Sequence, residues 1–251
     1  MSFQIRKVNN VKVEVPEVKV SSKKFPGDDL FDIQYFCMEL LGKRLSGKTS
    51  LIYTLLKKFV TKEMIVLFFV PTFHKDKAYK PIRKFLKQKK ITYDAYTSVE
   101  EDGVNMVEAF MDVNKYPGES EEKEEVKNDV CKFIAVDEKG KPKKKKKDKP
   151  REYFIIFDDM TGYLRKPAIL KLIKLSRHFR TKIIISTQSI ADIHPDVHAQ
   201  MDYIAVFKNF NEDSLDFLYE KLRLGISLEQ FKELYHYVTS LKFERTTISS
   251  F

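Results

Sequence analysis

Residues 42–49 read GKRLSGKT and directly follow the apolar run YFCMELL at residues 35–41. They fit the phosphate-binding pattern G-x-x-x-x-G-K-[ST], which requires an apolar strand before it and a helix after it. The two glycines let the backbone bend until successive N–H groups face an anion, and the start of the helix points its positive dipole end at the same place. The stretch predicts an α/β protein that binds a nucleotide.

Each position of this loop has an expected part in holding the nucleotide. The Lys48 ammonium would neutralise the β- and γ-phosphates during catalysis, and the Thr49 hydroxyl would ligate Mg²⁺. We expect ATP and Mg²⁺ as cofactors, bound by Gly42, Lys43, Arg44, Leu45, Ser46, Gly47, Lys48, Thr49 and Ser50. By itself the loop admits kinases, GTPases and motor ATPases.

Composition sets the outer limits of the protein. With 251 residues, 43% of them hydrophobic, the chain can bury one substantial core, so we expect a single domain with extensions. Cys37 and Cys131 are too few and too far apart for a disulfide scaffold or a zinc site, which predicts a reducing intracellular compartment. We find no apolar stretch of membrane-spanning length and no signal-peptide core, and expect a soluble protein.

The charge balance favours an acidic polymer as a partner. The formal net charge is +10 and the pI is about 9.3, although much of the excess can come from the five consecutive lysines at residues 143–147. These lysines belong to residues 117–150, where the composition changes from acidic to basic. We interpret 117–150 as a partly disordered insertion on the sheet. Its lysine run could be a DNA-engaging loop, a nuclear localisation signal or a solvated linker.

Hydrophobic patterns place the other elements of the first half. Residues 11–20 alternate apolar and polar side chains, which predicts an edge strand, or two short strands interrupted by Pro16, in an N-terminal extension over residues 1–30, with the main domain at 31–251. The main domain is expected to hold helices at 48–59, 80–90 and 105–113 and strands at 64–70 and from residue 91. The helix at 80–90 is basic, and its lysines could contact DNA phosphates, although a solvated helix face is the simpler interpretation.

A second strong signal is the stretch YFIIFDD at residues 153–159. An apolar strand that ends in acidic residues places carboxylates at the sheet edge, where enzymes with this phosphate-binding loop hold Mg²⁺ and polarise water. We expect Asp158 to bind Mg²⁺ and Asp159 to orient or deprotonate the attacking water. The alternative is that the acidic pair only begins a helix cap.

The second half predicts one more catalytic strand. After a helix at 167–179, the strand KIIISTQ at 182–188 ends in Gln188, whose amide could hydrogen-bond the γ-phosphate or the attacking water. The alternative for Gln188 is an amide that caps the next turn. A further strand is predicted at 202–207, and a helical C-terminal part begins at residue 211; the tail at 242–251 has no assignment.

Together these signals predict a P-loop NTPase fold of the RecA-like type with an additional catalytic strand (ASCE), in which helices flank a mainly parallel sheet.

The order of these motifs resembles the FtsK/HerA superfamily of DNA-translocating ATPases. Within it, the chain is similar to the genome-packaging ATPases of the poxvirus, giant-virus and virophage type. The resemblance rests on GKRLSGKT, IIFDD, SRHFRTKIIISTQ and IHPDVHAQMDYIAVF, and covers roughly residues 31–210. Two features depart from the superfamily pattern: an extra glycine before the final Gly-Lys is missing, where Ser46 is small enough to replace it, and the acidic pair is Asp-Asp where many members have Asp-Glu.

The resemblance implies partners as well as a fold. Members of this kind form homo-oligomeric rings in which an arginine of one subunit reaches the phosphate bound by the next, and removal of such an arginine costs several orders of magnitude in rate. Arg177 and Arg180 are the candidates, because they lie between the acidic strand and the Gln188 strand and would be near the carboxyl edge of the sheet or the subunit surface. The alternative is that either pairs with a local carboxylate.

The predicted function is therefore an ATP-driven motor that moves double-stranded DNA into a viral capsid. The resemblance further implies capsid or portal-vertex proteins as partners and a location at the viral assembly site in the host cell, with virion association also open. Two alternatives remain. A small-molecule or nucleotide kinase would share the loop, but the lysine-rich insertion lacks the arginine pattern of a kinase lid. A scaffold protein would use ATP only to set its oligomeric state.

Overall fold

A seven-stranded sheet organises the computed structural model of the chain, which describes residues 24–114, 151–208, 210–222 and 224–240 and a strand at 246–249. The strand predicted at 11–20 and the insertion predicted at 117–150, with its lysine run, lie outside the described residues. Those two interpretations stay predictions.

The strand order in the sheet is β3-β2-β6-β7-β1-β8-β9, and every pair is parallel except β8 with β9. The strands are β1 (Cys37–Leu41), β2 (Ile65–Phe69), β3 (Thr92–Tyr96), β6 (Tyr153–Asp158), β7 (Thr181–Thr187), β8 (Tyr203–Val206) and β9 (Thr246–Ser249). β1, β2 and β7 are buried along their whole length, as continuous apolar strands covered on both faces should be. The prediction of a mainly parallel sheet is confirmed.

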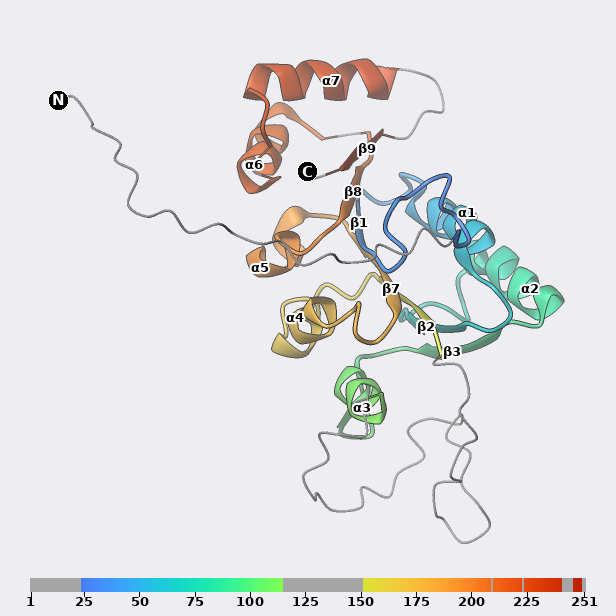
Figure 1. Cartoon of the computed structure of the whole chain (residues 1–251). Helices are drawn as coiled ribbons and strands as arrows, with labels where there is room; N and C mark the ends of the chain where they lie inside the picture. The colour runs from blue at the N-terminus through green and yellow to red at the C-terminus, as the bar shows by residue number, and fades with distance from the viewer. Residues whose placement is uncertain (1–23, 115–150, 209, 223, 241–245, 250–251) are drawn as a thin grey trace, which may run out of the picture.

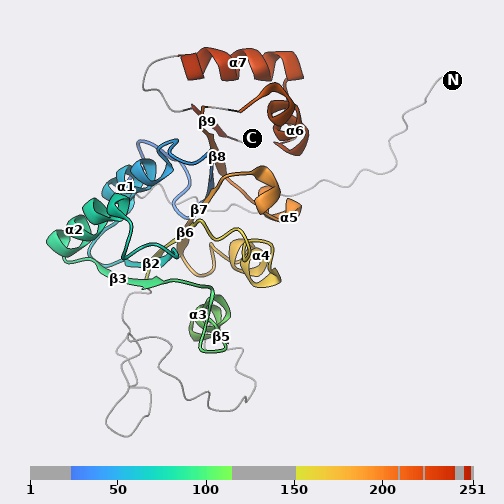
Figure 2. The ribbon, with the colours of Figure 1, turned by 180° about the vertical axis from the view of Figure 1, so that it is seen from behind.

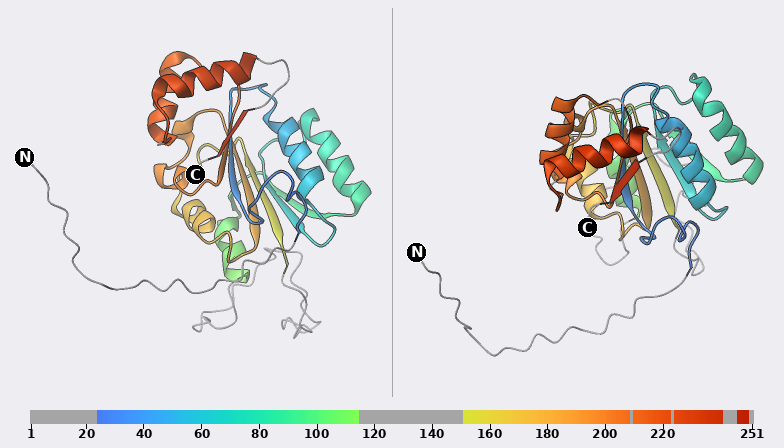
Figure 3. Two further views of the ribbon diagram at one scale, coloured as in Figure 1. Left: turned by 45° about the horizontal axis from the view of Figure 1, so that its top comes forward. Right: turned by 90° about the horizontal axis from the view of Figure 1, so that it is seen from above.

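Helices cover both faces of this sheet, as Figures 1 and 2 show from opposite sides. One face carries α1 (Lys48–Phe59), the short 3₁₀ turn η1 (Lys77–Tyr79) and α2 (Lys80–Lys89). The other face carries α3 (Met106–Val113), α4 (Pro167–Lys174), α5 (Pro195–His198), α6 (Glu212–Leu222) and α7 (Leu228–Ser240). The right-hand view of Figure 3, taken from above, shows the sheet between the two helical layers.

Each helical layer has its own apolar core, because side chains alternate between the two faces along every strand. From β1, Met38 and Leu40 enter the core beneath α1 and α2, whereas Cys37 and Leu41 enter the core beneath α3 to α7. Glu39 points to the same face as Cys37 and Leu41 and is fully buried. This is an unusual place for a carboxylate.

Several predicted elements have the expected bounds, one is shorter, and two elements were not predicted. The helix predicted at 48–59 is α1, and Asn105 caps α3 by accepting hydrogen bonds from the N–H groups of Val107 and Glu108. The helix predicted at 167–179 is shorter: α4 ends at Lys174, because the chain must turn back at Arg180, whose φ is 52°, to begin β7. The unassigned tail contributes β9, and a small hairpin of β4 (Glu100–Glu101) and β5 (Val104–Asn105) precedes α3.

The parallel register gathers the predicted site at one edge. Leu41, the last residue of β1, pairs with Thr187, and Asp158 at the end of β6 pairs with Ser186. The loops that follow these strands therefore leave the sheet side by side at its carboxyl edge. Within the described ranges, none of the helices combines the length and the apolar character needed to cross a membrane.

Candidate nucleotide site

The loop between β1 and α1 has the tight backbone that its glycines predict. A methyl group at Gly42 would lie 2.7 Å from both Ser46 Oγ and Phe207 Cβ, so no larger residue fits without displacing one of them. Gly47, which precedes α1, has φ of 98°, where a glycine avoids the strain of a side chain. Leu45 also has a left-handed φ, 64°, and is 98% exposed at the tip.

Lys48 lies inside this loop rather than pointing into solvent. Its ammonium donates hydrogen bonds to the carbonyl oxygens of Gly42, at 2.5 Å, and Lys43, at 3.1 Å. Burial lowers the pKa of Lys48, and the negative charges of Asp158, Asp159 and Asp192 oppose that shift. The cation is thus already at the mouth of the loop, facing a group of carboxylates.

Asp158 is the buried member of the acidic pair. It ends β6 with only 5% of its surface exposed, and its Oδ2 accepts a hydrogen bond of 2.5 Å from the hydroxyl of Tyr79 in η1. Burial raises the pKa of Asp158, and the nearby Ser186 hydroxyl and the hydrogen bond from the Tyr79 hydroxyl oppose that rise. The sequence gives no signal for Tyr79, because its contact with Asp158 spans 79 positions and depends on how η1 packs on β6.

Asp159 leaves the strand in a left-handed turn and meets Gln188. Its φ is 55°, and its Oδ1 accepts a hydrogen bond of 3.1 Å from Nε2 of Gln188. The Gln188 side chain does not cap the next turn; Ser189 and Asp192 form the capping box there. The fold therefore brings together the exposed carboxylate and the amide that sequence reasoning selected separately.

Arg177 and Arg180 lie at the opposite, amino edge of the sheet. This corrects the first of the two expected places, the carboxyl edge, whereas the Arg177 side chain is 69% exposed at the surface. Both arginines precede Thr181, the first residue of β7, which pairs with Tyr153, the first residue of β6. Arg177 also donates a hydrogen bond of 3.2 Å to Asp202. The physical reason is the parallel crossover: the chain returns through α4 to the amino edge before it can begin another parallel strand. Neither arginine can reach the phosphate-binding loop of its own chain.

The donors at the carboxyl edge fit Mg²⁺ with a nucleotide. Thr49 and Asp158 offer hydroxyl and carboxylate oxygens, the hard ligands that Mg²⁺ prefers, and this ion typically takes one or two protein ligands plus substrate phosphates. In the described part of the chain, no group of three or more His, Cys, Asp or Glu residues could hold a metal alone. The Ser46 hydroxyl is buried in the loop without a hydrogen-bond partner among the described residues.

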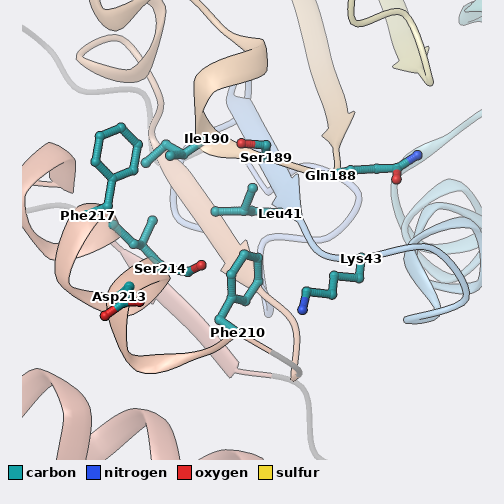
Figure 4. Close-up of a pocket in the computed structure, with 10 residues that line it drawn as sticks. Leu41, Lys43, Gln188, Ser189, Ile190, Phe210, Asp213, Ser214 and Phe217 are labelled. Atoms are coloured by element: carbon teal, nitrogen blue, oxygen red, sulfur yellow. The ribbon is translucent and has the colours of Figure 1, made fainter.

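A pocket of about 330 Å³ extends the site toward α6 (Figure 4). Lys43 and Phe210 lie near each other on one side of it, and the Gln188 side chain points away from the other labelled residues. The Gln188 amide there is hydrogen-bonded to Asp159. The remaining lining comes from Leu41, Ser189, Ile190, Asp213, Ser214, Phe217 and Leu218. The pocket continues the phosphate-binding loop with a wall that is partly aromatic and partly polar.

Comparison with protein families identifies the chain's relatives. The family model described as "Poxvirus A32 protein" matches residues 22–242. The chain belongs to the poxvirus A32 protein family. The matched range includes the phosphate-binding loop, Asp158, Asp159 and Gln188, together with the helical C-terminal part. Membership confirms the resemblance drawn from the motifs. No individually curated protein sequence matches the chain.

The chain is also similar to solved structures. The genome packaging NTPase B204 from Sulfolobus turreted icosahedral virus 2, in complex with AMP, is 17% identical and has a TM-score of 0.50. That match covers 86% of this chain and 94% of B204. The DNA-packaging ATPase B204 from Sulfolobus turreted icosahedral virus is 16% identical with a TM-score of 0.48, over 82% of this chain and 88% of that one. The first of these matches confirms the predicted P-loop NTPase fold.

Proposed function

We propose that this A32-family protein is an ATPase that moves double-stranded DNA into a viral capsid. The observation that carries the proposal is the carboxyl edge of the sheet, where Lys48, Asp158 and the hydrogen-bonded pair of Asp159 and Gln188 converge. A cation for phosphates, a buried carboxylate, an exposed carboxylate and an amide are the parts that hydrolysis of a nucleoside triphosphate requires. Family membership supports the viral context.

The proposed role of each site residue follows from its burial and its hydrogen-bond partners. Bound Mg²⁺ would neutralise charge on the β- and γ-phosphates. Thr49 and Asp158 would hold that ion, and Tyr79 would hold Asp158 in place. Lys48 would exchange its hydrogen bonds with the loop carbonyls for bonds with the phosphates. Asp159 would take the proton of the water whose oxygen bonds to the γ-phosphorus as the bond to ADP breaks, and Gln188 would orient that water or the γ-phosphate.

The oligomer and the DNA contacts are part of the same proposal. A ring would place each nucleotide at a subunit boundary, and Arg177 and Arg180, which cannot serve their own site, would act only on a neighbouring subunit. We propose that capsid or portal-vertex proteins anchor the ring at the viral assembly site. DNA would be held through its phosphates, since the chain carries a net charge of +10.

The deciding experiment is the ATPase rate measured with and without double-stranded DNA, with the particle mass recorded in the presence of nucleotide. We expect DNA to stimulate turnover and nucleotide to favour a ring. Lys48→Ala should abolish turnover, and a Lys48→Ala protein that hydrolyses ATP at the wild-type rate would overturn the mechanism. Transfer of phosphate to a small acceptor would indicate the kinase, and binding without turnover would indicate the scaffold.

A further inference from the structure

A buried polar network that the catalytic site does not use lies directly beneath Gln188. Glu39, in the middle of β1, is 0% exposed, yet its carboxylate has two partners from other elements. Oε1 accepts a hydrogen bond of 3.0 Å from the Thr187 hydroxyl at the end of β7. Oε2 lies 2.9 Å from Nδ1 of His198 on α5, whose ring is also buried. A carboxylate is tolerated in such a place only when it is fully paired.

The other side of the histidine ring fixes where the protons are. Nε2 of His198 lies 2.8 Å from the carbonyl oxygen of Ile190, which can only accept, so Nε2 carries a hydrogen. Nδ1 and Glu39 then share one more proton. Burial alone would lower the pKa of His198, but its bonds with Glu39 and the Ile190 carbonyl outweigh burial and raise that pKa, with Lys221 of α6 opposing them. The Glu39 carboxylate therefore favours the protonated form of the His198 ring.

The two contacts bracket the residue that we propose as the catalytic amide. Thr187, bonded to Glu39, comes directly before Gln188, and Ile190, bonded to His198, comes two residues after it. Between these points, the Asp192 carboxylate accepts hydrogen bonds from the N–H groups of Gln188 and Ser189. The segment that carries Gln188 is thus held at both ends to Glu39, three residues ahead of Gly42 in the strand that leads into the phosphate-binding loop.

From this geometry we propose that Glu39 and His198 are positioning residues for the hydrolytic step, which hold Gln188 at a fixed place relative to the phosphate-binding loop. The inference rests on the proposed role of Gln188. A buried ion pair contributes little to stability compared with well-packed apolar side chains. Here both of its outward hydrogen bonds go to the residues that flank Gln188, which gives the pair a role that an apolar pair could not fill.

The main test is His198→Phe, which keeps a ring of similar size but cannot bond to Ile190 or Glu39. We expect kcat for ATP to fall about 10- to 100-fold, as for other residues that orient a catalytic group. The nucleotide dissociation constant should change less than about 3-fold, since Lys48 and the loop backbone are untouched. His194→Phe, at the start of the same short helix but with a side chain that is 44% exposed, is the matched control and should keep kcat. A His198→Phe enzyme with wild-type kcat would overturn the inference.

Glu39 provides a second test that does not depend on the folding of His198→Phe. Glu39→Gln can still accept from Thr187 and donate to Nδ1 of a neutral His198, so its kcat should stay within about 3-fold of wild type. Glu39→Leu cannot form either bond and should match His198→Phe. Equal kcat values for Glu39→Gln and Glu39→Leu would show that the hydrogen bonds of Glu39 do not position Gln188.

A double variant separates this inference from the proposed function. If His198 acts through Gln188, then His198→Phe should add nothing to the loss of kcat in Gln188→Ala, whereas independent effects multiply. Multiplying effects would overturn the positioning role alone. A Gln188→Ala enzyme with wild-type kcat would instead remove the catalytic role of Gln188, and the inference with it, while leaving Lys48 and Asp158 as tests of ATP hydrolysis.

Discussion

Tyr79 illustrates what a single hydroxyl group does in this site. Burial and the neighbouring Asp158 raise the pKa of Tyr79, so its hydroxyl stays protonated and donates to the Asp158 carboxylate. This hydrogen bond orients the carboxylate at the end of β6, where we propose that it holds Mg²⁺. The Tyr79 hydroxyl therefore orients Asp158, the proposed Mg²⁺ ligand. Loss of a group that hydrogen-bonds to a metal ligand typically costs about 10- to 100-fold in metal affinity or activity.

We predict that Tyr79→Phe raises the Mg²⁺ concentration for half-maximal ATPase activity by about 10-fold or more. The phenyl ring remains packed against Phe68 and Phe73, so the thermal midpoint should change little. Titration of the ATPase rate with Mg²⁺ measures the effect. Tyr53→Phe, which removes a hydroxyl from α1 at a distance from Asp158, is the matched control. An unchanged Mg²⁺ requirement in Tyr79→Phe would show that its hydroxyl does not orient the ligand.

At the scale of elements, the Glu39–His198 pair ties β1, β7 and α5 together, and its stabilisation should depend on pH. Because contact with Glu39 raises the pKa of His198 above its ordinary value of 6.5, the folded state binds the proton more tightly than the unfolded chain. The contribution is therefore fully present below pH 6.5 and is lost as the pH rises through the folded-state pKa.

We predict that the free energy of unfolding of the wild-type protein falls over this range more steeply than that of Glu39→Gln. Glu39→Gln removes the negative charge that raises the pKa of His198, so folding should favour protonation of the ring less. Denaturant unfolding at a series of pH values from 6 upward compares the two slopes. If the free energy of unfolding changes with pH in parallel for the two proteins, the Glu39–His198 pair takes up no extra proton on folding.

The same elements show what sequence patterns can and cannot predict. Continuous apolar runs correctly predicted β2, β6 and β7, because a strand buried on both faces needs apolar residues at consecutive positions. The loop pattern gave the bounds of α1, because the bend of the loop depends on residues that are adjacent in the sequence. The carboxyl edge was the wrong edge of the sheet for Arg177 and Arg180, because their position depends on where α4 ends. The partners of Asp158 and Glu39 were also missed, because Tyr79 and His198 approach them only when distant helices pack on the sheet.

For the whole molecule, the question is which surface grips DNA. Lys80, Lys84 and Lys87 are exposed and spaced to lie along one face of α2, on the same side of the sheet as α1. The helix begins with Pro81 in its first turn and buries Ile82 and Leu86, so its lysine face is held rigidly outward. A basic face of this kind binds DNA phosphates without regard to base sequence. Its affinity for DNA falls as the salt concentration rises, because binding releases counterions from the DNA. The competing interpretation is a solvated face with no partner.

Charge reversal distinguishes these two interpretations. If the face of α2 contacts DNA, Lys80→Glu with Lys84→Glu should weaken DNA binding and reduce the slope of log affinity against log salt by about 2, one for each phosphate that a lysine no longer neutralises. The basal ATPase rate without DNA should stay unchanged, because neither lysine contacts the nucleotide site. Lys171→Glu with Lys174→Glu, exposed on α4 on the other face of the sheet, makes the same change of charge and serves as the control. Equal salt slopes for the two double variants would assign the α2 lysines to a solvated face, whereas a lower slope in the α2 variant alone would place the DNA on the side of the sheet that carries α1 and α2.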